Sequence, residues 1–296
     1  MNPTLIPIRQ GRPGFEEFIG SWFYPGNRAT VVDVGPSRSI HVLLQSLSEM
    51  GVERVDLVLL THIHADHAGG LAEFLRVFPM AQVICHDRAI GHLIDPAKLW
   101  LGTQKALGDL ALTYGPINPV GKQWLVPHTT AKIAGLEIFE TPGHAPHHLS
   151  YVYEGKLFAG EAGGIYLTVG QSEYLRPATP PVFFLKEFAA SMDRLLFRGD
   201  LPIYYGHFGR AENSGPLLKR ARHQLLFWEG IISEESSRGL GDAVERCVER
   251  LLKEDPELKA FGEMSLDDQE RERFFIANSI RGYLGYLQNL SGQSLK

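Results

Sequence analysis

Cysteine is scarce in this chain, which has only Cys85 and Cys247 among its 296 residues. Such usage disfavours a disulfide-stapled secreted domain and fits a reducing compartment. The sequence also lacks any apolar run near the roughly 20 residues that a membrane helix needs. Its first residues show neither a charged start nor a following apolar stretch, so no secretory signal is recognisable. These absences predict a cytoplasmic protein without a membrane partner.

Excess positive charge is missing as well. The chain has 29 lysines and arginines against 34 aspartates and glutamates, a formal net charge of -5. A general nucleic-acid binder usually needs a basic face, so this balance argues against nucleic acid as a partner. The sequence contains no G-x-S-x-G nucleophile motif and no P-loop. The expected partner is therefore a small-molecule substrate, and homo-oligomer formation stays open.

Short apolar runs alternate with glycine- and proline-marked turns from about residue 5 to 210, a pattern typical of α/β proteins. Strands are predicted at residues 30–33, 55–60, 81–85, 136–139, 149–153, 156–159 and 202–205. Apolar residues at helical spacing predict a helix after the first strand and another over residues 185–197.

After about residue 215 the pattern becomes purely helical. Apolar residues recur every three or four positions, with charged residues between them, and Ser265 followed by Asp268 resembles a helix start. We therefore predict an α/β domain over residues 1–214 and a helical extension over residues 215–296 that packs on it.

The most informative segment is the run from Thr61 to His67, which directly follows a predicted buried strand. It places three imidazoles and one carboxylate within six residues: His62, His64, Asp66 and His67. Borderline metals such as zinc bind imidazole and carboxylate together. A structural role alone would require each of these crowded histidines to be satisfied by hydrogen bonds. The segment therefore indicates a metal site at the end of a strand.

Three more ligand-type residues follow predicted strands at wide spacing. His144 ends Thr-Pro-Gly-His, Glu161 follows Gly160, and His207 follows Gly206. An adjacent glycine lets the backbone approach a crowded centre. Each residue alone would more often be a surface or hydrogen-bonded group. Together with the first segment, they predict that several strand ends meet at one site.

In this order, the motifs resemble those of the metallo-β-lactamase superfamily, over about residues 28 to 210. Thr-His-x-His-x-Asp-His-x-Gly-Gly and Thr-Pro-Gly-His-x-Pro are most similar to motifs of glyoxalase II-like and lactonase-like hydrolases. The resemblance implies an αββα sandwich with two metals at one edge. With the purely helical pattern after residue 215, the expected fold is this α/β sandwich with a C-terminal helical extension.

The resemblance also implies a ligand set. It assigns His62, His64 and His144 to a first metal. It assigns Asp66, His67 and His207 to a second. Asp33 would support a ligand rather than bind metal itself. The cofactor is expected to be Zn²⁺, two ions per chain, with iron or manganese as alternatives.

Glu161 departs from the pattern of the superfamily, whose bridging carboxylate is normally Asp. The extra methylene moves the carboxylate by about 1.5 Å. Three outcomes follow: the loop retracts and Glu161 bridges, it binds one metal only, or it hydrogen-bonds while one metal binds weakly. Because Glu is a common zinc ligand, bridging or single-metal ligation is the preferred prediction.

The resemblance implies a metal-dependent hydrolase. A divalent cation lowers the pKa of bound water to near ~7, which supplies hydroxide at neutral pH. Asp66 is the candidate catalytic residue that positions this water or accepts its proton. An ester-type substrate, thioester or lactone, is expected. Two alternatives remain open: a mononuclear iron persulfide dioxygenase, and a metal-holding regulatory or binding protein with vestigial catalysis.

Other segments give weaker predictions. His147 is expected at the surface, and His148 as a supporting residue. His86 and His92 are outside candidates for the cleft. The proline-rich segment 174–184 is interpreted equally well as a rigid connector or as a cleft wall.

Overall fold

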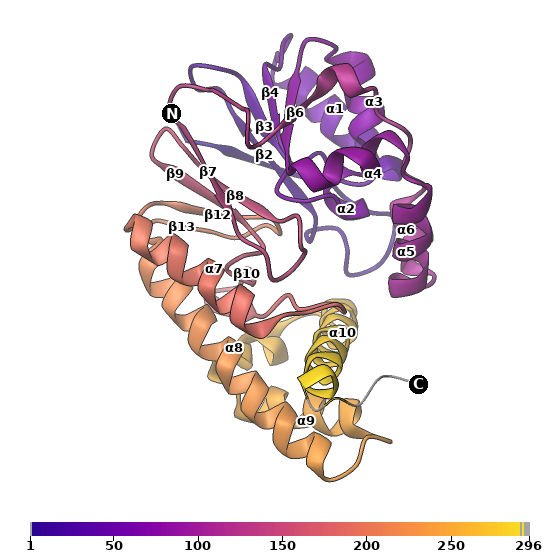
Figure 1. Ribbon diagram of the computed structural model, residues 1–296, viewed down its shortest axis with the longest axis vertical. Helices are drawn as coiled ribbons and strands as arrows, with labels where there is room; N and C mark the ends of the chain where they lie inside the picture. Colours follow the sequence, from indigo (N-terminus) through magenta and orange to yellow (C-terminus); the bar gives the residue numbers. More distant parts are fainter. Residues whose placement is uncertain (1, 291, 293–296) are drawn as a thin grey trace.

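Two β-sheets face each other in the computed structural model, which describes residues 2–290 and 292 (Figure 1). The first sheet has the order β1-β2-β3-β4-β5-β6. Its strands are β1 Thr4–Pro7, β2 Gly20–Tyr24, β3 Thr30–Val32, β4 Leu57–Leu59, β5 Gln82–Cys85 and β6 Leu125–Pro127. From β3 to β6 neighbouring strands run parallel, so their carboxyl ends lie at one edge.

The second sheet has the order β13-β12-β9-β8-β7. Its strands are β7 Leu136–Glu140, β8 Leu149–Tyr153, β9 Lys156–Gly160, β12 Ile203–Tyr205 and β13 Arg210–Ala211. β9 and β12 are parallel, and β8 runs antiparallel to both β7 and β9. Strands β7, β9 and β12 therefore end in the same direction. A separate hairpin consists of β10 Ile165–Val169 and β11 Ser172–Arg176.

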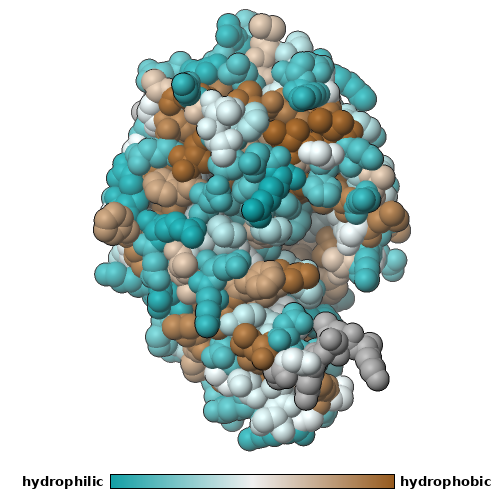
Figure 2. Space-filling view, in the orientation of Figure 1, coloured by the Kyte–Doolittle hydropathy of each residue, from teal (hydrophilic) through white to brown (hydrophobic). Residues whose placement is uncertain are grey.

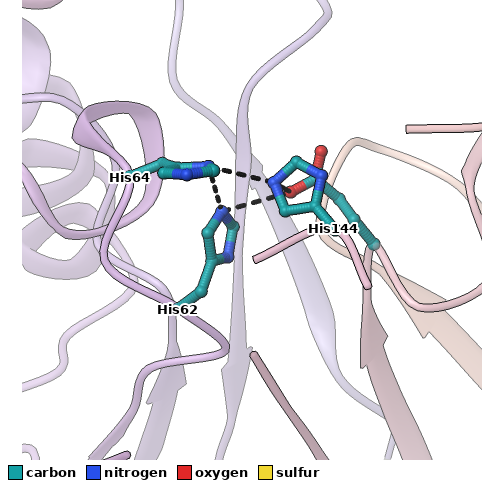
Figure 3. Close-up of side chains that lie close together, drawn as sticks. His62, His64 and His144 are labelled. Carbon is teal, nitrogen blue, oxygen red and sulfur yellow. Dashed lines mark hydrogen bonds and ion pairs between the residues drawn. The ribbon is translucent and has the colours of Figure 1, made fainter. Parts of the chain in front are cut away.

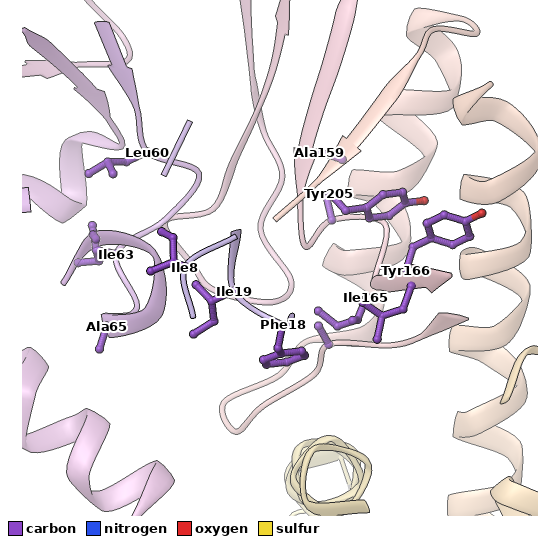
Figure 4. Close-up of a cluster of buried hydrophobic side chains, with 14 of the residues drawn as sticks. Ile8, Phe18, Ile19, Leu60, Ile63, Ala65, Ala159, Ile165, Tyr166 and Tyr205 are labelled. Atoms are coloured by element: carbon purple, nitrogen blue, oxygen red, sulfur yellow. The ribbon is translucent and has the colours of Figure 1, made fainter. Parts of the chain in front are cut away.

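Alternation of side chains along the strands creates two hydrophobic cores. Leu57 and Leu59 of β4 point between the sheets, where they meet Tyr151 and Phe158. Val58, between them in sequence, belongs to the larger outer core. Figure 4 shows part of that core, from Leu60 near the first sheet towards the helices beside the second. Both sheets are thus buried on two faces.

Helices cover the outer faces of both sheets (Figure 1). The helices beside the first sheet include α1 Ile40–Glu49, α3 Leu71–Val77 and α4 Ile90–Ile94, and those beside the second are α7 Leu185–Arg198 and α8 Ser214–Ser237. The remaining short elements are η1 Ser37–Ser39, α2 Ala65–Ala68, η2 Asp87–Ala89, α5 Ala97–Leu107, α6 Leu110–Tyr114 and η3 Lys122–Trp124. This layering confirms the predicted αββα sandwich.

The C-terminal helices pack on the sandwich through a buried charged network. They are α9 Ala243–Glu254, η4 Pro256–Glu263 and α10 Leu266–Leu290. Glu272 of α10 accepts hydrogen bonds from Tyr174 and Arg176 of β11 and from its neighbour Arg271. Arg271 also donates to the carbonyl oxygen of Gly14. The helical extension is confirmed, and the domain boundary after residue 214 stays a prediction.

The predicted strands all exist, although β4 is three residues shorter than expected and most of the others differ by one residue. Residues 149–153 match β8, and the helix expected at 185–197 matches α7 Leu185–Arg198. Sequence reasoning missed β1, β2, β6, the β10–β11 hairpin and the helices α4, α5 and α6. In the described part of the chain, no helix combines the length and apolar character needed to cross a membrane.

Candidate metal centre

Strand ends bring the predicted ligands together at one edge of the sandwich. His62 lies just after β4, and His64 immediately precedes the short helix α2, which carries Asp66 and His67. Glu161 directly follows β9. His144 and His207 come from the loops after β7 and β12, respectively. All seven predicted metal-site residues fall into two adjoining groups.

The first group contains three histidines and one carboxylate (Figure 3). His64 Nδ1 lies 3.0 Å from His62 Nε2 and 2.9 Å from His144 Nε2. Glu161 Oε2 lies 3.2 Å from His62 Nε2 and 2.9 Å from His144 Nε2. Ligand atoms of a tetrahedral zinc shell lie about 3.3 Å apart when each is about 2.0 Å from the ion. The group therefore has the spacing of a tetrahedral cation site.

The second group contains Asp66, His67 and His207. The two Nε2 atoms are 3.3 Å apart, and each lies 3.7 Å from Asp66 Oδ2. Glu161 reaches this group as well, because its Oε2 is 3.5 Å from His67 Nε2 and its Oε1 is 3.4 Å from His207 Nε2. Its carboxylate thus lies between the two groups, in the position of a bridge.

Hydrogen bonds on the far side of each ring fix which nitrogen faces inward. His144 Nδ1 lies 3.0 Å from the carbonyl oxygen of Ala178, and His207 Nδ1 lies 3.0 Å from that of Phe18. A carbonyl oxygen only accepts, so both Nδ1 atoms carry the proton. The Nε2 lone pairs then face the centre, as in metal-bound histidines held by an outer partner.

Asp33 has the same effect on His67. Its Oδ2 lies 2.9 Å from His67 Nδ1, and its carboxylate also accepts hydrogen bonds from the backbone N–H and the hydroxyl of Thr61. The φ angle of Asp33 is 55°, a conformation that non-glycine residues seldom adopt. These contacts hold Asp33 as an outer support of the centre, as the resemblance implied.

Lone pairs that face one another at these distances need a positive charge between them. Glu161 Oε2 is buried and has no hydrogen-bond partner among the described residues. Inward imidazole nitrogens and an unpaired carboxylate oxygen are the donor set that borderline divalent cations prefer. The residues present therefore fit two cations that share Glu161.

The electrostatics of the chain agree with this arrangement. Burial lowers the pKa of His64 to about 4, so the imidazole stays neutral and keeps a lone pair. Burial alone would raise the pKa of Glu161, but His144 and His207 hold it well below its usual value. Burial would also lower the pKa of His67, yet the carboxylates of Asp66 and Asp33 outweigh it and raise that pKa to about 10. The second group thus attracts positive charge strongly.

A cavity of about 470 Å³ opens beside the two groups. Its walls come from α2, α5, α6, the segment after β11 and α10. Residues 178–182 form part of the wall, so the proline-rich segment is a cleft wall. Apolar side chains dominate, including Phe18, Leu99, Leu107, Ile165, Val182 and Phe275. Figure 2 shows this face hollowed between the upper body and the lower helices.

A third histidine-rich group contains His86, Asp87 and His128. The Nδ1 atoms of both histidines accept backbone N–H groups, those of Arg88 and Asp87, at 3.1 and 3.2 Å. Both Nε2 atoms must then carry protons, and that of His128 donates to Glu140 at 3.0 Å. Neither imidazole has a lone pair left for a cation in this tautomer, so the two histidines form a hydrogen-bonded link.

The sequence-based prediction was wrong for His147 and left the position of His92 open. His147 was expected at the surface, but it is half-buried and lines the cavity, with its ring centroid 6.0 Å from that of His64. His92 lines the cavity too. Sequence reasoning missed Tyr114, whose position in the cavity wall depends on a helix that it did not predict.

The chain belongs to the metallo-β-lactamase superfamily, because the profile of that superfamily matches residues 17–207. Members use divalent metal ions, and relatives are named as hydrolases, so the chain is a hydrolase with groups suited to a dinuclear site.

Three relatives cover most of the chain. The metallo-beta-lactamase fold-containing protein ST1585 of Sulfurisphaera tokodaii is 29% identical over 77% of this chain and 86% of that protein. Its crystal structure has a TM-score of 0.68 and covers 96% of this chain and 98% of that chain. A hydroxyacylglutathione hydrolase of Photobacterium profundum is 28% identical over 84% and 87%. An atrochrysone carboxyl ACP thioesterase of Aspergillus fumigatus is 26% identical over 82% and 70%.

Proposed function

We propose that this protein hydrolyses an ester-type small molecule, a thioester or a lactone, with two zinc ions. His62, His64 and His144 would hold the first ion, and Asp66, His67 and His207 the second. Glu161 would bridge them. The observation that carries the proposal is the carboxylate of Glu161, which lies within 3.5 Å of Nε2 atoms from both groups.

Two further observations support an ester substrate. Two of the relatives described above bear names that specify hydrolysis of a thioester-type substrate or thioesterase activity. The cavity next to the centre is mainly apolar, which suits an acyl group better than a highly charged substrate. Lys98 also lines the cavity, where its ammonium group can pair with an anionic end of a substrate.

Bound divalent cations would lower the pKa of water and polarise a carbonyl oxygen. The chain supplies the rest of the chemistry. Asp66 borders the cavity, and its carboxylate is partly exposed there, so it can accept a proton from the attacking water. Asp33, Ala178 and Phe18 keep the ligand rings oriented. The apolar walls limit competing water around the substrate.

The position of Glu161 between both groups favours this function over the mononuclear iron dioxygenase. A protein purified without added metal should contain about two equivalents of zinc and should hydrolyse butyryl or decanoyl thioesters or lactones. A chelator should abolish turnover, and zinc should restore it. His62→Ala should remove the first ion, whereas His41→Ala, on the exposed side of α1, should retain both. One iron per chain, with oxygen consumption on a persulfide, would refute the proposal.

A further inference from the structure

Three buried polar atoms without a hydrogen-bond partner among the described residues belong to side chains that line one cavity. They are Tyr114 Oη, His147 Nδ1 and Glu161 Oε2. Buried polar atoms are nearly always paired, so each needs a partner that the chain does not supply. The proposed cations would account for Glu161 Oε2. The other two atoms are left for a molecule in the cavity.

Tyr114 is the more informative of the two. It is the last residue of α6, only 1% exposed, and α6 packs against α2, which carries Asp66 and His67. A phenol has an ordinary pKa of about 10, so it is protonated at neutral pH, and burial favours this neutral form further. The hydroxyl therefore keeps its proton and acts as a donor towards an oxygen atom in the cavity.

We propose that the Tyr114 hydroxyl donates a hydrogen bond to the carbonyl oxygen of the bound ester, and to the same oxygen of the carboxylate product. This inference rests on the proposed function and makes Tyr114 a catalytic residue. The carbonyl oxygen gains negative charge as water attacks the carbon. A donor held in a buried wall stabilises that charge without reorganisation.

Tyr114→Phe removes only the oxygen atom and tests the contact directly. With zinc-loaded full-length protein and a butyryl thioester, kcat should fall by about a hundredfold and KM should rise by at most about tenfold, because the hydrogen bond strengthens as charge builds on the oxygen. The zinc content and the thermal midpoint should stay unchanged, because the hydroxyl has no partner within the described part of the fold. Tyr205→Phe is the matched control, since Tyr205 is also buried with an unpaired hydroxyl but does not line the cavity. It should leave kcat and KM unchanged.

A binding measurement separates this inference from the proposed function. Butyrate, titrated into the zinc-loaded proteins, should bind about tenfold more weakly to Tyr114→Phe than to the wild type. If the wild type hydrolyses no ester but shows this difference, the proposed function fails and the contact stands. Equal butyrate affinity in the two proteins, or binding by neither, overturns the contact, as does full kcat in Tyr114→Phe.

Discussion

Glu161 is the residue at which this chain departs from its superfamily, and the structure shows how the longer side chain is accommodated. Its backbone N–H donates to His148 Nε2 at 3.0 Å, and the Nδ1 atom of His148 lies 2.8 Å from the hydroxyl of Thr141. These contacts hold the main chain in a place from which the carboxylate meets both groups of ligands. His148 therefore has the supporting position that the sequence predicted.

Shortening the Glu161 side chain should weaken the binding of one ion, whereas neutralising it should weaken the binding of both. Glu161→Asp withdraws the carboxylate by about 1.5 Å, so we expect one zinc to be retained and the other to bind more weakly. Glu161→Gln should lower the content of both ions, because a neutral amide is a poor ligand. Zinc titration into the metal-free variants measures both effects. Tighter binding of the second ion by the Asp variant would contradict the bridging position of Glu161.

When metal is removed, the free energy of unfolding should decrease both at acidic and at alkaline pH. Burial lowers the pKa of His64 to about 4 and that of His147 to about 3, against 6.5 for the free side chain. The unfolded chain then binds more protons below pH 6.5, so stability falls as the medium becomes more acidic. The pKa of His67 is raised to about 10, so its contribution is complete below 6.5 and is lost as pH rises.

The metal-free protein should therefore be most stable near pH 6.5, with a loss of roughly 1–3 kcal/mol by about pH 5. Urea unfolding at several pH values gives this profile. The zinc-loaded protein is the control and should show a flatter profile, because bound cations replace the protons. A metal-free protein whose stability does not change between these pH values would contradict the assigned charges.

Local sequence revealed the ligands but not all of their surroundings. His62, His64, Asp66 and His67 are adjacent in the chain, so their chemistry is visible as a motif. Tyr114 and His147 carry no such signal. Their roles follow from which cavity they line and from what they do not contact, and both properties depend on packing between distant segments.

At the scale of elements, the turn after β9 sets the position of Glu161. Gly160 has a φ of 57°, and a Cβ atom there would lie 2.5 Å from His148 Nε2. An L-residue in this conformation costs about 1–2 kcal/mol from the backbone alone. The close approach to His148 adds a clash at the atom that fixes the Glu161 backbone.

Gly160→Ala should accordingly reduce zinc content and stability together, by more than the backbone cost alone. Gly170→Ala is the matched control, because Gly170 has a φ of 59° and no atom within 4 Å of its added Cβ. It should cost about 1–2 kcal/mol and retain both ions. Thermal unfolding and metal analysis of the two variants separate the cost of the backbone conformation from the cost of the clash with His148. Equal behaviour would show that His148 does not fix the turn.

Most elements with a clear period were predicted, but the fully buried strand β2 was missed, because Gly20 and Ser21 shorten its apolar run. Strands buried on both faces, such as β4 and β8, appear as apolar runs. β1 and β6 have few buried residues, and β6 contains Pro127. Helix α5 has no buried residue, so it lacks the apolar stripe by which a helix is recognised.

At the scale of the whole molecule, Glu272 links α10 to β11, because it is fully buried and paired with Arg176 of β11 and with its neighbour Arg271. Glu272→Gln leaves the buried guanidinium of Arg176 without its carboxylate and removes one of the two carboxylates paired with Arg271, so we expect a loss of about 3–5 kcal/mol in the free energy of unfolding. Glu137→Gln, which breaks the exposed pair with Arg198, should cost at most about 1 kcal/mol. Chemical denaturation measures both, and similar losses would contradict a central role for Glu272.

Phe18 connects the candidate metal centre with the C-terminal helix α10. Its carbonyl holds His207, and its ring stacks on Phe275 and lies under Arg271, both from α10. All of the predicted ligands, up to His207, precede α10 in the sequence. During synthesis they are therefore made before the helix that packs against Phe18. We therefore expect the proposed second ion to bind tightly only when α10 is packed against Phe18, because that packing fixes the residue whose carbonyl orients His207.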